Sequence, residues 1–204
     1  MLEKIIEPAG FMIIRDQLYS VVFSEIENQK SMATGDYLTM LNSFYNENGN
    51  LSIFQERSEP FDVQELNAIN IWITNVDENE GSNSRLQKGK VSFNIDIATF
   101  SQNNYTESVK YLHWMAAVIR GFLMTDEYLR LGFSDKSFIS RRWVPGINIY
   151  QPNDPNNTDY LCGGSVSFIV EYDEKNLEKD SSLFDGNHSW ITAGDYGEFK
   201  LEKI

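Results

Sequence analysis

Two segments near the middle of the chain alternate apolar and polar residues with the period of a β-strand. Isoleucine stands at every second position of residues 69–73, and Val, Phe and Ile do the same over residues 91–97. Successive side chains of a strand point to opposite faces, so each segment has one apolar and one mostly polar face. The chain is therefore expected to build a sheet that is covered on one face only, as many antiparallel sheets are.

Other segments have the apolar spacing of helices that could cover such a sheet. Residues 11–29 carry it, and so do residues 105–124, which follow a possible capping box made by Asn104 and Glu107. A shorter helix is predicted from Gly35 to Phe44. Thr125 is expected to cap a short continuation of the 105–124 helix that stops at Gly132.

Further strands are predicted on either side of the central pair. Residues 51–55 form a candidate short strand whose partner the sequence does not identify, and residues 165–172 alternate clearly. Residues 139–150 read as a strand interrupted by Pro145-Gly146. Val76 to Gly89, rich in Asn, Ser, Gly and charge, is predicted to be an extended hairpin loop.

This order of elements predicts an α+β fold. It consists of one antiparallel β-sheet with a long β-hairpin, one face of which is covered by two main helices. A chain of 204 residues can bury one such core. We assign residues 1–172 to the α+β domain and residues 173–204 to an acidic C-terminal extension.

Charge and cysteine content narrow the classes of function. The chain has 17 Lys and Arg against 30 Asp and Glu, a net charge of −13, which disfavours sequence-specific DNA binding. The single cysteine, Cys162, cannot form an internal disulfide. The N-terminal residues do not read as a signal peptide, and no apolar stretch approaches the length of a membrane span.

Side chains suited to catalysis are scarce. The two histidines are His113, within a predicted helix, and His188, in the acidic extension, and neither has an evident partner. Cys162 lacks any signature that would activate a thiol. The chain has no nucleophile elbow, phosphate loop, zinc-binding helix motif or dinucleotide fingerprint. Residues 77–88 do not fit a calcium-binding EF-hand loop, because the glycine comes one position early and Lys88 stands where the final glutamate should be. We therefore predict no catalytic, cofactor-binding or metal-binding residue.

One alternative keeps an enzymatic role open. Asp96 and Glu171 both fall on polar strand faces, and two carboxylates are what a carboxylate-dependent enzyme acting on glycan would need. Acids on a solvent-facing strand are nevertheless ordinary. A binding module without catalytic activity is a further alternative.

Other features favour association with protein subunits. Arg141 and Arg142 precede Trp143 on a predicted strand, and Arg and Trp are enriched at interface hot spots. An arginine stem that covers the sheet edge explains the same residues equally well.

The chain resembles the tail terminator, or tail completion, proteins of tailed bacteriophages, and the related minor tail and neck proteins. The resemblance lies in the stretch KVSFNIDIATF of residues 90–100, the helix 105–124 and the stretch FISRRW of residues 138–143. Strands at residues 147–152 and 164–168 close the sheet in the same order. It is a likeness in the order of elements and not a signature motif.

The resemblance implies a virion structural protein made in the host cytoplasm, without enzymatic activity or cofactor. Such proteins form a ring of their own copies, usually a hexamer, that caps the tail tube protein and joins it to the head connector, while DNA only passes through the lumen. An acidic lumen would repel DNA phosphates. A neck or baseplate subunit is the related alternative. The implied subunit-interface residues are Asp77, Glu78, Glu80, Arg85, Lys88, Lys90, Arg141, Arg142 and Trp143.

Overall fold

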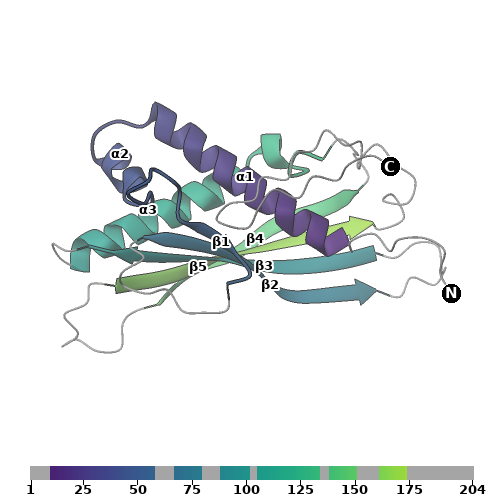
Figure 1. The fold of residues 1–204 in the computed structure, drawn as a ribbon. Coiled ribbons are helices and arrows are strands. Elements are labelled where there is room, and N and C mark those ends of the chain that lie inside the picture. Colours follow the sequence, from purple (N-terminus) through teal and green to yellow (C-terminus); the bar gives the residue numbers. More distant parts are fainter. Residues whose placement is uncertain are drawn as a thin grey trace.

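The fold is α+β, as predicted, with helices and a five-stranded sheet in two layers (Figure 1). The computed structural model describes residues 10–57, 67–79, 88–101, 105–133, 138–150 and 161–173. The helices are α1 (Gly10–Met32), α2 (Gly35–Asn42), α3 (Tyr105–Leu123) and a 3-10 turn, η2 (Asp126–Tyr128). The strands are β1 (Ile53–Gln55), β2 (Ala68–Asn79), β3 (Lys88–Phe100), β4 (Ile139–Tyr150) and β5 (Leu161–Asp173).

The sheet has the order β1-β2-β3-β5-β4. β2, β3, β5 and β4 pair antiparallel, and only the short β1 lies parallel to its neighbour β2. The last described strand in the chain, β5, therefore lies inside the sheet, between β3 and β4. The predicted antiparallel sheet is confirmed, with one parallel pair added at the β1 edge.

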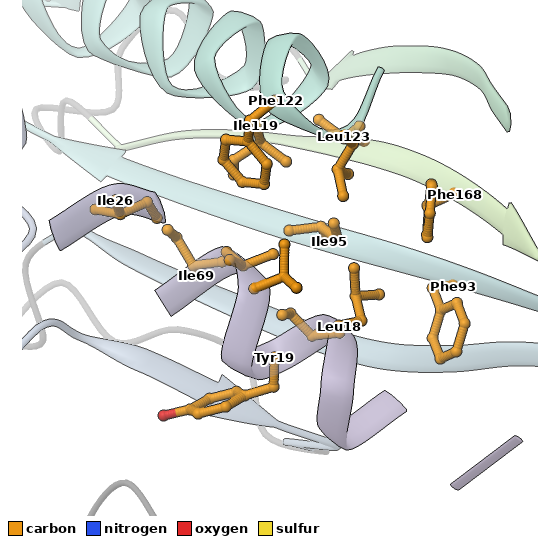
Figure 2. Packing of buried hydrophobic residues seen from close by; sticks show 14 of the residues in the cluster. Leu18, Tyr19, Ile26, Ile69, Phe93, Ile95, Ile119, Phe122, Leu123 and Phe168 are labelled. Atoms are coloured by element: carbon orange, nitrogen blue, oxygen red, sulfur yellow. The ribbon is translucent and has the colours of Figure 1, made fainter. Parts of the chain in front are cut away.

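The two main helices lie on the same face of the sheet (Figure 1). α1 covers β2 and β3, while α3 covers β3 and β5. Figure 2 shows Leu18 of α1 and Ile119 and Leu123 of α3 directed toward the strands around Ile95. Every one of these side chains is fully buried. The apolar side chains of β3 are therefore removed from water by the helices that pack on that face.

The hairpin is longer in its strands and shorter in its loop than the sequence predicted. The loop was expected from Val76 to Gly89, but β2 continues through Asn79 and β3 begins at Lys88. The reason is that Val76 pairs with Val91 on the buried face, so the ladder continues although the residues between are polar. Residues 80–87 lie outside the described ranges.

The end of α3 also differs from the prediction. Thr125 does not cap η2 with its side chain; its hydroxyl instead donates to the Phe122 carbonyl at 2.8 Å, back into α3. Gly132 has a φ of +82°, which confirms the expected left-handed position after this helix pair. Asn104 lies outside the described residues, and its predicted partner Glu107 accepts hydrogen bonds from Ser101 and Tyr111.

Candidate functional site

The second face of the sheet is polar, and within the described residues no helix covers it (Figure 1). The strand register determines which side chains lie on this second face. A residue that faces away from the core on one strand is paired with a residue that also faces away from the core on the neighbouring strand. We call this surface the helix-free face. Its members are Asn70, Trp72, Asp77, Lys90, Ser92, Asn94, Asp96, Arg141, Trp143, Asn148, Tyr150, Ser165, Ser167, Ile169 and Glu171.

Hydrogen bonds between strands hold the middle of the helix-free face. The Trp72 indole Nε1 donates to Asp96 Oδ2 at 2.6 Å, and the Ser167 hydroxyl donates to Asn94 Oδ1 at 3.1 Å. Near the end of β4, the hydroxyls of Tyr150 and Ser165 lie 3.2 Å apart. These contacts join β2 to β3, β3 to β5 and β5 to β4, so the face is a connected polar surface.

Asp96 is the acidic side chain of this network. Its second carboxylate oxygen, Oδ1, is buried and has no hydrogen-bond partner among the residues that the structure describes. Burial raises the pKa of the carboxyl above its ordinary value, and the hydrogen bond from Trp72 only partly opposes that. A carboxyl with a perturbed pKa is a candidate for a functional role. Burial of an acid within its own sheet, without any function, shifts the pKa in the same direction.

A row of alternating charges crosses the sheet at the hairpin end. Asp77 on β2 is paired with Lys90 on β3, Lys90 with Glu171 on β5, and Glu171 with Arg141 on β4. We call these four residues the charged row. Opposite charges directly across a strand pair are stabilising, so the row favours this register over a shifted one.

Trp143 lies beside the charged row, two residues from Arg141 on β4 and on the same face, opposite Ile169. The Arg141 guanidinium carbon is 4.9 Å from the centroid of its ring, and the Lys90 ammonium nitrogen is 5.8 Å from it. Cations at these distances are attracted by the electron-rich ring. Lys90, Arg141 and Trp143 thus form one cluster of two cations and an aromatic ring.

Arg142 is directed to the other face, although it sits between Arg141 and Trp143 in the chain. Its register partner is the buried Val170, and its guanidinium donates to the Thr125 carbonyl beyond the end of α3. Burial lowers the pKa of this guanidinium, and nearby Asp126 opposes the shift. Arg142 therefore ties β4 to the C-terminal end of α3, where a cation is favourable.

The remaining predicted interface residues belong to the hairpin. Lys88 is exposed and is paired with Asn79. The Glu78 backbone is paired with Gly89, while the Glu78 side chain, Glu80 and Arg85 lie outside what the structure describes. The sequence thus identified Asp77, Lys90 and Arg141, but it assigned Glu171 only to a possible enzyme. Knowledge of the register alone would have shown that Glu171 completes their row.

The residues considered for chemistry are not brought together. His113 is exposed on α3, and His188 lies outside the described residues. Cys162 is buried on β5; burial raises the pKa of its thiol, and a hydrogen bond with Tyr105 only partly opposes this. A thiol in that state is a poor nucleophile at neutral pH.

Asp96 and Glu171 are far apart on the helix-free face. Glu171 pairs with Lys90, six residues from Asp96 along β3. At about 3.4 Å per residue this separates the two carboxyls by roughly 20 Å. Glycosidase pairs are about 5 to 9.5 Å apart, so these two acids could not act on the same glycosidic bond.

Among the residues that the structure describes, no three His, Cys, Asp or Glu side chains group in a way that could hold a metal ion. None of the described helices is long and apolar enough to cross a membrane. Comparison with known proteins adds no assignment: no family model and no curated protein matches the chain.

Proposed function

We propose that this protein is a virion structural protein whose copies form a ring that caps a phage tail tube and joins it to the head connector. The feature that supports this best is the helix-free face with its charged row, which runs from β2, beyond the end of β1, to the outer strand β4. Such a surface is suited to contacts with protein.

The distribution of side chains supports assembly over catalysis. The Arg141, Lys90 and Trp143 cluster has the residue types that are enriched at protein interfaces. The only carboxyl pair considered for chemistry, Asp96 and Glu171, is too widely spaced. The order of elements, with a helix-backed sheet and a long hairpin, is the one on which the resemblance to tail terminator proteins was based.

The charge of the chain suits a ring through which DNA passes. A net charge of −13 per copy repels phosphate on average, so DNA would slide through the lumen without being held. The expected partners are further copies of the chain, the tail tube protein and the head connector, within the virion. A neck or baseplate subunit would use the same kind of surface, and it differs in which part of the virion it binds.

Electron microscopy of the purified chain mixed with tail tube protein tests this function. We expect rings at one end of each tube and an end to further tube growth. Rings that bind only the connector or baseplate would favour the neck or baseplate role. A chain that stays monomeric and leaves tube ends unchanged would contradict a capping role.

A further inference from the structure

At the hairpin end, β2 and β4 each have a segment without an outer neighbour among the described strands, β2 because the short β1 ends before it. On β2, coverage by β1 stops at Ile73: the Glu56 amide donates to the Ile71 carbonyl at 2.9 Å, and the Glu56 carboxylate accepts from the Ile73 amide at 3.1 Å. In the described part of the chain, Thr74 to Asn79 has no strand on its outer side. β4 likewise has no outer neighbour among the described strands.

The two free segments match in length. Thr74 to Asn79 spans six residues of β2, and Ile139 to Val144 spans six residues of β4. Pro145 follows, within an irregularity of the ladder between Trp143 and Gly146, and proline has no amide hydrogen to donate. Pairing along either segment would therefore stop after the same number of residues.

The charged row ends in opposite charges at these two edges. Asp77 stands on the free part of β2, and Arg141 stands on the free part of β4. Charges on edge strands discourage sheets from joining, because like edges repel. Here two β2 edges, or two β4 edges, repel each other, whereas a β2 edge and a β4 edge attract.

The direction of the strands also permits such a contact. Three antiparallel pairings separate β2 from β4, so the two strands run in opposite directions. A second copy placed with its helices on the same side would thus add its β2 to β4 as an ordinary antiparallel neighbour. Asp77 of that copy would lie opposite Arg141, and its Asn75 opposite Trp143.

We propose that copies of this chain join head to tail through these edges, the free β2 segment of one copy pairing with the β4 segment of the next. The charged row then continues from copy to copy with alternating sign. A contact between two different patches repeats from copy to copy, and it forms a closed ring when the rotation between copies closes. This inference rests on the proposed function, because it specifies how the copies of that ring touch.

Charge reversal tests the pairing. Asp77→Lys alone or Arg141→Glu alone places like charges across the contact, and we expect the apparent association constant in analytical ultracentrifugation to fall roughly tenfold or more. The double variant restores opposite charges and should recover assembly. An equimolar mixture of the two single variants should also assemble, because each supplies the edge that the other needs. Circular dichroism checks that each variant is folded.

Cysteine crosslinking tests the register independently of charge. In a Cys162→Ala background, Asn75→Cys with Trp143→Cys should give a ladder of crosslinked oligomers on oxidation. Within one copy these positions are three strand spacings apart, about 14 Å, and a disulfide spans Cα atoms no more than about 7 Å apart. The control pairs Asn75→Cys with Asn148→Cys, which is on the same face of β4 but beyond Pro145. It should give no ladder.

The outcomes separate this contact from the function on which it rests. Oligomers that persist in both single charge variants, or a ladder in the control pair alone, would overturn the edge pairing while leaving a ring at the tube end possible. A wild-type chain that stays monomeric would overturn it as well. Edge-paired rings that ignore tube ends would support the pairing and contradict the capping role.

Discussion

Gly89 shows how closely the hairpin is packed against the next strand. It is paired with Tyr172, and a Cβ added at Gly89 would come within 2.2 Å of the Tyr172 ring. Tyr172 is fully buried and packs against Phe138, so its ring has little room to move. We expect Gly89→Ala to lower the free energy of unfolding by about 1 to 3 kcal/mol in urea denaturation. Gly146→Ala, where an added Cβ meets nothing within 4 Å, should be close to neutral.

Asp96 carries a cost in stability that depends on pH. Because burial raises its pKa in the folded state, the unfolded chain ionises first as pH rises above about 4. Stability from this group is therefore lost as pH rises toward and through the folded pKa. Asp96→Asn should raise the free energy of unfolding at pH 7 by about 1 kcal/mol, and the difference should vanish near pH 3. A variant less stable than wild type at pH 7 would show that the charge has a partner after all.

Among the elements, α1 is joined to η2 by a buried carboxylate. Burial alone would raise the pKa of Glu25, but hydrogen bonds from Gln29, Tyr128 and Asn28 lower it below its ordinary value. The Tyr128 hydroxyl donates to Glu25 Oε2 at 2.7 Å across these two elements. Glu25 therefore contributes stability that is present above about pH 4.3 and is lost as pH falls through its folded pKa.

Removal of that donor should loosen the helix layer. We expect Tyr128→Phe to cost about 1.5 to 3 kcal/mol at pH 7, as for a hydrogen bond to a charged group, and less in acid. Thermal unfolding at pH 7 and at pH 3.5 measures the loss of stability at each pH. Tyr37→Phe is the control, because within the described residues the Tyr37 hydroxyl donates to the neutral Gln29 side chain, at 3.4 Å. An equal loss in both variants would argue against a special role for Glu25.

The elements also show what the sequence can and cannot predict. α1, α3, β5 and the core of the hairpin follow from periodicity, because their apolar faces are buried on one side. The parallel pairing of β1 has no local signal, since no turn fixes its partner. The ends of the hairpin strands were missed because Asp77 and Lys90 are polar. The charged row depends on strand order, and strand order is set by packing across the whole sheet.

At the scale of the whole molecule, charge is the property with the clearest consequence. A net charge of −13 should prevent binding to the outside of DNA. We expect no retardation of linear duplex DNA in a gel shift at about 10 µM protein and roughly 0.15 M salt. Retardation that disappears as salt rises would instead indicate a local basic patch, for which the Lys88, Lys90 and Arg141 region is the candidate. Lys90→Gln would identify it.

The position of β5 inside the sheet sets when the protein can finish folding during its synthesis. β3 ends at Phe100 and its neighbour β5 begins at Leu161, so the ribosome adds 60 residues between them. At about 5 to 20 residues per second, β3 waits roughly 3 to 12 seconds for its partner. Of the described helices, α1 is already made at that point and α3 follows during the wait, and both cover the apolar face of the hairpin in the folded structure. We therefore expect early contacts between these helices and the hairpin to protect the nascent chain from aggregation.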